Sequence, residues 1–413
     1  MKLNKLQKIF DGAVAAAIPQ LKAEIVRTKL QNAGITVSSE QASKILDKLK
    51  DGKFEFEVED EQVDRAILQE EAEHDLRLVF SGDEVDEIVK QMPDVVQQTV
   101  DGFAKLMLKR IRKELASHVS GHLSDRDNFK RRLWRHWKKP LELFHVYLGI
   151  CNEAGAEFNK LYRRQAAKKN DVVFEVLIRL QARGCQIALE VVTLLESGLA
   201  DGAHARWRSL HEVACVAMFI KHHDQELANR YLLHDFVQSR KSANRYQEWS
   251  QALGHRRLSK RALASQERRY QMVINQFGKD FSGDYGWAAE KLAKQKPTFA
   301  DIEKAVGLEK LRPYYRMASD NVHANARAIR FKLGLPDGDV MLLAGASDAG
   351  LADPGDGAAM SLLQLTTALL TSKPNIDSLV MCAMLTNLRD QIGTEFLKAH
   401  KALGKKSLRS RKL

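Results

Sequence analysis

Two segments of the chain carry arginine and histidine at helical spacing. In HARWRSLHE, residues 204–212, a helix would place His204, Arg208 and His211 on one face, with Glu212 beside them. Arginine binds phosphate oxygens in a two-pronged geometry, and histidine can gain or lose a proton near neutral pH. The segment therefore has two interpretations: a phosphate-handling site, or a structural pair of Arg208 with Glu212 that fastens two helices together.

The second segment is RMASDNVHANARAIRF, residues 316–331. A continuous helix would align its charged side chains along one narrow stripe, made of Arg316, Asp320, His323, Arg327 and Arg330. The alanines between them would let a second helix or a ligand approach the backbone, and Asn321 and Asn325 add hydrogen-bonding groups. The stripe is either a functional surface or a solvated helix face.

A weaker pattern is the dipeptide His234–Asp235. The order His211, then His234–Asp235, then Asp320 is similar to the ligand order of HD-type metal phosphohydrolases, which are also all-helical. Histidine and aspartate suit a divalent metal, so such a phosphohydrolase is one alternative function. The chain has no Walker A motif, no GxGxxG after a strand and no GxSxG, which argues against Rossmann enzymes and serine hydrolases.

The composition is typical of a soluble globular protein with a basic surface. The 413 residues carry a formal net charge of +12, and the four cysteines, at positions 151, 185, 215 and 382, form no CxxC pair. Reduced thiols and the lack of a signal peptide or of a long apolar stretch predict a cytoplasmic protein that does not enter membranes. No cofactor and no metal are expected in the leading interpretation.

Positive charge is concentrated in two runs. Residues 126–139, RDNFKRRLWRHWKK, hold seven basic residues against one acid, with Phe129, Trp134 and Trp137 between them. Such a run can bind nucleic acid phosphates while its aromatic rings stack on unpaired bases; the alternative is an amphipathic helix whose tryptophans pack inward. The second run is the acid-free tail at 398–413. The acidic stretch from Glu55 to Asp75 is either an intramolecular partner of these runs or a solvated face.

Hydrophobic periodicity predicts an all-α, multi-helix bundle, with helices at about 171–197, 202–221, 224–249, 258–277, 286–295, 312–333 and 358–400. Gly198 is expected to end the first of these helices, Asp201 to cap the second and Pro140 to start another. Two departures from helix are expected. FEFEV at 54–58 could be a short edge strand, and the Gly/Asp-rich loop from Gly334 to Gly357 could hold a small hairpin at 340–351.

These elements predict four parts of the chain. They are an N-terminal helical region at 1–125, a basic aromatic helical connector at 126–168, a helical core domain at 169–397 and a basic tail at 398–413. The N-terminal region is either a sensor or a partner-binding domain, and its sequence does not decide between these roles.

Three stretches, GLADGAHARWRSLHEVACVAMFI, ANRYLLHDF and YRMASDNVHAN, resemble an uncharacterised bacterial family, domain of unknown function 5677. The resemblance covers about residues 170–385. It rests on the loop rich in Gly and Pro and on Arg206, Arg208, His211, Glu212, Tyr231, His234, Ser319 and His323. The family has no assigned activity, so this resemblance implies none.

A second resemblance is to the HEPN domains, helical bundles that include metal-independent RNases of bacterial toxins and phage defence. Their signature is an arginine, four to six residues, then a histidine. Arg206 to His211 is separated by four residues and Arg316 to His323 by six, with Asp320 or Asn321 in the role of the usual polar residue. HEPN-like domains often dimerise, so the resemblance implies a homodimer.

The resemblance implies a ribonuclease chemistry in which RNA supplies its own nucleophile, the 2′-hydroxyl. His211 and His323 would act as base and acid, while Arg208 and Arg316 stabilise the charge on the phosphorane. The residues expected to bind substrate are Arg206, Asp320, Asn321, Arg327, Glu212 and His234. The leading hypothesis is a HEPN-like ribonuclease or a nucleic-acid-binding effector that acts on RNA, and the main alternative is a non-enzymatic helical interaction module.

Overall fold

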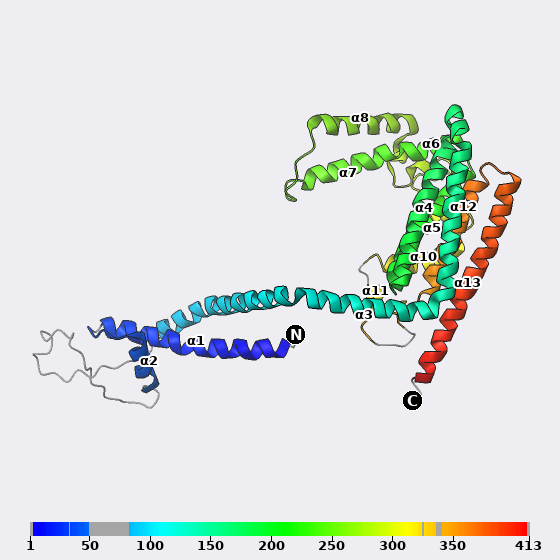
Figure 1. Ribbon diagram of the computed structural model, residues 1–413. Helices are drawn as coiled ribbons and strands as arrows, with labels where there is room; N and C mark the ends of the chain where they lie inside the picture. The colour runs from blue at the N-terminus through cyan, green and yellow to red at the C-terminus, as the bar shows by residue number, and fades with distance from the viewer. Residues whose placement is uncertain (1–2, 33, 49–81, 324–325, 336–340, 411–413) are drawn as a thin grey trace, which may run out of the picture. The chain divides into compact units, whose positions relative to one another are not determined.

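The protein is all-α, which confirms the predicted fold class. The computed structural model describes residues 3–32, 34–48, 82–323, 326–335 and 341–410, and within these ranges it contains helices and turns but no strand. The chain divides into two compact units, residues 1–124 and 125–413 (Figure 1). The predicted edge strand at 54–58 and the acidic stretch at 55–75 lie outside the described residues.

The first unit contains α1 (Leu3–Asn32), α2 (Ser39–Lys48) and the first part of α3 (Gly82–Lys169). α1 and α2 pack against each other through apolar side chains at helical spacing. The residues buried between them are Ala23, Val26 and Leu30 of α1 and Ala42, Ile45 and Leu46 of α2. Gly34, with a φ of 83°, takes the left-handed conformation that lets the chain reverse after α1.

The core of the second unit is a bundle of long helices. The second part of α3 packs with α4 (Val172–Glu196), α5 (Ala200–Lys221), α12 (Ala352–Leu370) and α13 (Ile376–Ser410) (Figure 1). The largest side chains that this bundle removes from solvent include Trp137, Phe144, Tyr147, Phe174, Phe219 and Phe396. No helix in the described ranges combines the length and the apolar character that crossing a membrane requires.

A buried amide joins three helices of the bundle. Gln181 of α4 donates from Nε2 to the carbonyl oxygen of Cys151 in α3 at 3.1 Å and to Oγ1 of Thr366 in α12 at 3.1 Å. Both Gln181 and Thr366 are buried. Because a buried amide destabilises a protein unless it is hydrogen-bonded, these contacts account for a polar side chain in an apolar core.

The ends of α4 and α5 follow the sequence signals in part. Gly198, with a φ of 70°, lies two residues after Glu196, the last residue of α4, and ends the helix as predicted; Leu199 N–H donates to the carbonyl of Leu194 at 2.9 Å. Asp201 does not cap α5, because the helix already begins at Ala200; its Oδ1 accepts from Leu333 N–H at 3.0 Å instead.

Pro140 was expected to start a helix, but α3 continues through it. Proline has no amide hydrogen to complete the bond to the carbonyl four residues earlier, so α3 lacks one hydrogen bond of its ladder at this position. The sequence pattern on both sides of Pro140 is helical, and its side chain is buried in the bundle, which compensates for the missing bond.

Three further helices lie beside the bundle: α6 (Gln225–Leu233), α7 (Asp235–Trp249) and α8 (Lys260–Phe277). The single helix predicted at 224–249 is therefore interrupted, and the interruption falls at His234. The imidazole of His234 makes a hydrogen bond to the carbonyl of Gly283 at 2.8 Å, a contact to a segment that local periodicity does not reveal.

The segment after α8 consists of short elements: η3 (Lys279–Ser282), η4 (Gly286–Ala288), α9 (Phe299–Ala305), η5 (Glu309–Leu311), α10 (Arg312–Asp320) and α11 (Ala326–Arg330). The helix predicted at 286–295 is reduced to one short 3₁₀ turn. The helix predicted at 312–333 is also wrong as one element, because α10 ends at Asp320.

The long loop is shorter than predicted, and its described part holds no hairpin. Residues 341–350 are irregular, so the hairpin expected at 340–351 is wrong for the residues that are described there. α12 begins at Ala352 and includes Pro354 in its first turn, where a missing N–H costs nothing. Gly355 and Gly357 lie inside α12. These positions require glycine because a Cβ atom there would come within 2.4 Å of Phe396 and 2.9 Å of Trp207, respectively. These glycines allow close packing rather than loop flexibility.

Candidate functional site

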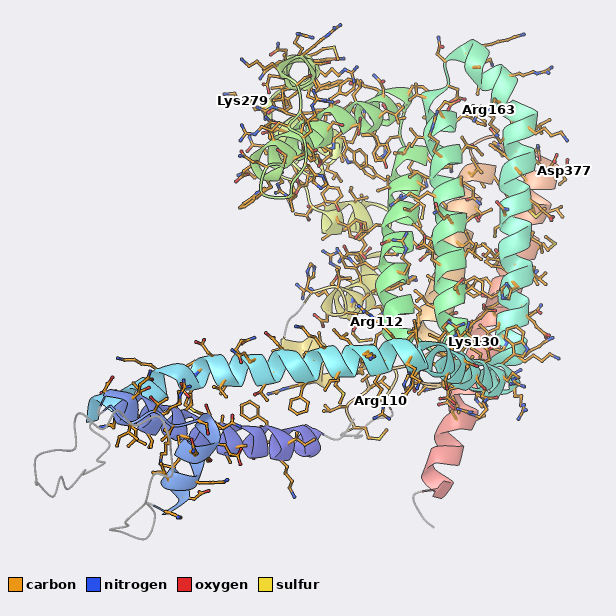
Figure 2. All side chains as sticks on the ribbon, turned by 60° about the vertical axis from the view of Figure 1, so that its left-hand side comes forward. Arg110, Arg112, Lys130, Arg163, Lys279 and Asp377 are labelled. Atoms are coloured by element: carbon orange, nitrogen blue, oxygen red, sulfur yellow. The ribbon has the colours of Figure 1, made fainter. Side chains whose placement is uncertain are left out.

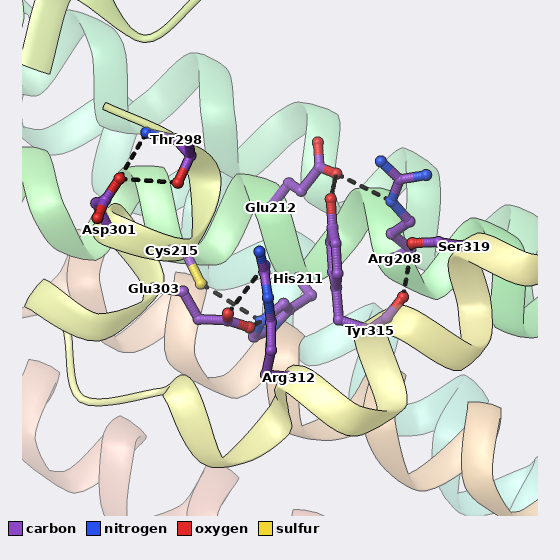
Figure 3. A network of polar contacts seen from close by, with 10 residues as sticks. All are labelled: Arg208, His211, Glu212, Cys215, Thr298, Asp301, Glu303, Arg312, Tyr315 and Ser319. Atoms are coloured by element: carbon purple, nitrogen blue, oxygen red, sulfur yellow. Dashed lines mark hydrogen bonds and ion pairs between the residues drawn. The ribbon is translucent and has the colours of Figure 1, made fainter. Parts of the chain in front are cut away.

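His211 lies at the centre of a polar cluster between α5, α9 and α10. Its Nε2 is 2.9 Å from Oε1 of Glu303, and both side chains are almost completely closed to solvent, at 0% and 1% exposure (Figure 3). Because the carboxylate can only accept, the imidazole donates from Nε2. Arg312 at the start of α10 completes the arrangement by donating to the second oxygen of Glu303 at 3.1 Å.

The electrostatics of this cluster favour a neutral imidazole. Burial lowers the pKa of His211 from its ordinary value, and the hydrogen bond and negative charge of Glu303 oppose that shift without cancelling it. The charge of Glu303 is balanced by Arg312, whose side chain is 32% exposed. Cys215 lies one turn further along α5, with its Sγ 3.6 Å from His211 Nε2, and burial raises the pKa of this thiol.

Arg208 and Glu212 form the outer part of the same cluster. Arg208 Nε lies 3.2 Å from Glu212 Oε1, so the structural pair predicted for this helix is present. Tyr315 of α10 donates its hydroxyl hydrogen to Glu212 at 2.5 Å, and its ring lies under the Arg208 guanidinium at 4.8 Å (Figure 3). Burial and the neighbouring Glu212 raise the pKa of Tyr315. These contacts fasten α5 to α10, as the structural interpretation requires.

The second predicted segment is divided between two elements and a turn. Arg316 is exposed on α10, and His323 is exposed in the turn that follows Asn321, the residue that caps α10. Asp320 forms an ion pair with Arg327 of α11 at 3.5 Å. The single stripe expected from Arg316 to Arg330 does not form, because the helix does not continue. His211 is buried while His323 is exposed, and no hydrogen bond or ring contact joins these two described residues.

The remaining predicted residues serve in local contacts. Arg206 forms an ion pair with Glu190 of α4 and donates to Ser209 Oγ at 3.3 Å. His234 is buried, and burial lowers its pKa. In the part of the chain that is described, no group of three or more His, Cys, Asp or Glu side chains is arranged to hold a metal ion. The residues of the HD-type alternative, His211, His234, Asp235 and Asp320, therefore do not converge on a metal site.

In the basic run of α3, the aromatic residues face inward. Trp137 is fully buried, packs against Phe396 and donates from Nε1 to the carbonyl of Asp348 at 2.8 Å. Leu133 is buried on the same side of the helix, and Trp134 is half-buried against the core. Bases therefore cannot stack on Trp137 in this structure. The tryptophans fit the alternative prediction of an amphipathic helix whose tryptophans pack inward.

The basic side chains of the run face outward. A shallow pocket of about 380 Å³, here called the Arg131 pocket, is lined by Asp125, Asn128, Arg131, Arg132 and Arg135. All five residues are exposed, and Asn128 accepts a hydrogen bond from Arg131 at 2.8 Å. Within the described residues, no carboxylate pairs with the three guanidinium groups. Figure 2 shows Lys130 on the same part of α3.

A second opening adjoins the His211 cluster. This pocket of about 430 Å³ is lined by residues that include Lys279, Tyr285, Lys296 and Thr298 (Lys279 is labelled in Figure 2). The ring of Tyr285 lies 6.4 Å from that of Phe299, which contacts the ring of His211 at 5.8 Å. Burial and the charge of Glu212 raise the pKa of Tyr285 to about 12. The aromatic rings thus separate His211 from the opening.

Sequence reasoning missed Glu303, Arg312, Tyr315 and Tyr285. Glu303 is 92 residues from His211, and periodicity reports only on neighbours within one or two helical turns. One available signal was the histidine itself, because most buried imidazoles have a hydrogen-bonding partner, although His204 on the same helix has none.

The comparisons with known proteins give a family match for part of the chain. No curated protein and no solved structure shows a significant match to this sequence. The family match is narrower than the expected range of 170–385, and it leaves out α12 and α13. Residues 174–340, a stretch that begins within α4 and ends before α12, match the family of unknown function DUF5677.

Proposed function

We propose that this protein binds nucleic acid, with RNA as the expected ligand, through phosphate contacts to the outward face of α3. The observation that carries the proposal is the Arg131 pocket, where Arg131, Arg132 and Arg135 are exposed and unpaired by any described carboxylate. Guanidinium groups form paired, charge-assisted hydrogen bonds with phosphate oxygens. The net charge of +12 adds a long-range attraction for a polyanion.

The proposed contacts are to the phosphate backbone of the nucleic acid rather than to its bases. Trp137 is buried and hydrogen-bonded to Asp348, and so it is not available to stack on a base. Binding should therefore show little sequence preference and a strong dependence on salt, as expected when arginine side chains displace counterions.

Binding without cleavage is the function that the geometry favours. A catalytic histidine must reach the proton that it transfers, and His211 has no exposed surface because α9 and α10 cover it. A HEPN-like ribonuclease that uses His211 and His323 would need α9 and α10 to separate from α5. The ribonuclease is therefore the second candidate. It is supported by the presence of Arg208, His211 and Glu303 in one polar cluster rather than by an open active site.

The binding proposal is tested by fluorescence anisotropy with a labelled single-stranded RNA across a series of salt concentrations. The variant Arg131→Ala, Arg132→Ala, Arg135→Ala should bind at least about tenfold more weakly, and the slope of log K against log salt should fall by about 2, since each lost phosphate contact contributes about 0.7. A single-stranded DNA of the same sequence, run in parallel, tests the preference for RNA.

A matched control removes the same charge from arginines that are already paired. Arg110, Arg179 and Arg240 form ion pairs with Glu114, Glu175 and Glu267. The triple alanine variant at these positions should bind RNA nearly as well as the unchanged protein. Equal losses in the two variants would show that only total charge matters, and the proposed site would be wrong.

The ribonuclease candidate is tested separately. Purified protein is incubated with RNA in the presence of EDTA, beside the variant His211→Ala, His323→Ala. Cleavage that is lost in the double variant would favour the ribonuclease over simple binding. Cleavage that persists in the double variant would reject these two histidines as its catalytic residues.

A further inference from the structure

A pocket at the end of α13, separate from the Arg131 pocket, has the character of a small-molecule site. It has a volume of about 420 Å³ and is lined by residues of the segments 331–335, 348–353 and 400–404, the last of these in α13. The volume is within the range of pockets that hold small ligands. Its apolar wall includes Phe331, Leu333 and Leu403.

Three hydrogen bonds to α3 and α5 fix the walls of this pocket. Leu333 N–H donates to Asp201 of α5 at 3.0 Å, and Trp137 of α3 donates to the Asp348 carbonyl at 2.8 Å. His136 of α3 lies 2.8 Å from the carbonyl oxygen of Ala399 in α13 and donates to it. The pocket is therefore formed before any ligand binds, which reduces the entropy that binding costs.

Gly350 brings the two loop segments of the pocket together. It has a φ of 76°, and a Cβ atom at this position would lie 2.0 Å from the carbonyl oxygen of Leu333. Only glycine allows this close approach, because any side chain would collide with backbone. The loop thus contributes to the pocket through a specific contact between residues 333 and 350.

The charged groups of the pocket carry a net negative charge. Asp348 and Asp353 line it and are exposed, and neither forms an ion pair with a described residue. Lys332 and His400 also line it, so with a neutral imidazole the formal balance is two negative charges against one positive. Two carboxylates in a pocket with an apolar wall favour a ligand with one cationic nitrogen and an apolar body.

We propose that this pocket binds a small organic amine whose apolar part contacts Phe331, Leu333 and Leu403 and whose ammonium group is held by Asp348 and Asp353. The ammonium would donate hydrogen bonds to the two carboxylates, and the net negative charge would disfavour anionic ligands. The site is independent of the proposed nucleic acid surface, because the two pockets share no residue.

Isothermal titration calorimetry of the full chain tests the proposal with three probes of similar size: phenethylamine, phenethyl alcohol and hydrocinnamate. Phenethylamine should bind, the alcohol should bind about tenfold more weakly, and the carboxylate should bind more weakly still. Absence of phenethylamine binding, or equal binding of the amine and the alcohol, would overturn the proposal.

Substitution of the carboxylates places the binding in this pocket. Asp348→Asn and Asp353→Asn should each weaken phenethylamine binding about tenfold, because each removes a charge-assisted hydrogen bond. Both side chains are exposed, so the variants should fold, which circular dichroism checks, and either one alone decides the question. Asp280→Asn, in the pocket beside Tyr285, is the control and should bind like the unchanged protein. Unaltered binding in either test variant would refute the proposed site.

Discussion

The imidazole of His211 and the carboxylate of Glu303 form a hydrogen-bonded pair at 2.9 Å inside the protein, with neither side chain open to solvent. Arg312 contacts the other carboxylate oxygen at 3.1 Å and extends towards the surface. A buried charge is tolerated only when it is paired, so these three residues depend on one another. Their arrangement explains why α9 and α10 pack on α5 at this position.

The substitution Glu303→Gln should destabilise the protein by about 1–3 kcal/mol. It keeps the size of the side chain but leaves Arg312 without its counter-charge and weakens the hydrogen bond from His211. Urea denaturation followed by circular dichroism measures the change in the free energy of unfolding. Glu309→Gln, at an exposed glutamate between α9 and α10, should change it little. Similar stability of the two variants would contradict a structural role for Glu303.

His204 should make the stability depend on pH. Burial lowers its pKa from 6.5 to about 4, and both ring nitrogens lack a hydrogen-bonding partner. Below pH 6.5 the unfolded state binds a proton at His204 that the folded state does not. The contribution of His204 to the free energy of unfolding is therefore complete above pH 6.5 and is lost as the pH falls towards 4. The loss amounts to about 3 kcal/mol.

The variant His204→Phe keeps an aromatic ring in the stack on Trp207, where the ring centroids lie 5.3 Å apart, but removes the titrating group. Its free energy of unfolding should therefore fall less steeply with acidification than that of the unchanged protein. Urea denaturation at several pH values provides the comparison. Parallel curves for the two proteins would show that His204 does not titrate as described.

Gly350 and Gly254 form a natural comparison, because both have positive φ angles, 76° and 69°. At Gly254 nothing lies within 4 Å of an added Cβ atom, so alanine there should cost only the backbone strain, about 1 kcal/mol. At Gly350 the collision with the Leu333 carbonyl adds to that strain, and the total loss should exceed about 3 kcal/mol. Equal losses of unfolding free energy would disprove the close approach of the two loop segments.

The variant Trp137→Phe separates stability from nucleic acid binding. It removes the hydrogen bond to Asp348 and part of a fully buried ring, so it should destabilise the protein by about 1–3 kcal/mol. RNA affinity, measured by anisotropy under conditions where the variant is folded, should stay unchanged. A large loss of RNA affinity in a folded variant would mean that this tryptophan contacts the nucleic acid after all.

The sequence predicted the long elements of the bundle well, because α4 and α5 each repeat apolar residues at helical spacing over many turns. It failed where the outcome depended on distant residues. The segment 312–333 reads as one helix, yet α10 ends at Asp320. The glycines of 355–357 read as a loop, yet they let α12 pack closely on Phe396 and Trp207.

The candidate site was predictable only in its α5 half. The spacing of Arg208 and Glu212 correctly indicated an ion pair, because residues four apart face each other on a helix. The partner of His211 comes from α9, and no local pattern connects residues so far apart in the chain. In the basic run, the same alternation of Trp and Arg fits base stacking and core packing equally well, and the contact with Asp348 decides for packing.

The amide of Gln181 gives the bundle a unique alignment. Apolar helices can slide past one another by a turn and still bury similar surface, since contacts between hydrocarbon side chains have little directionality. The hydrogen bonds of Gln181 to Cys151 and Thr366 form only when α3, α4 and α12 pack in one axial register. Replacing this glutamine with leucine should therefore change the free energy of unfolding little but allow more than one alignment of the helices. In the leucine variant, a shifted bundle would no longer leave a buried amide without its hydrogen bonds.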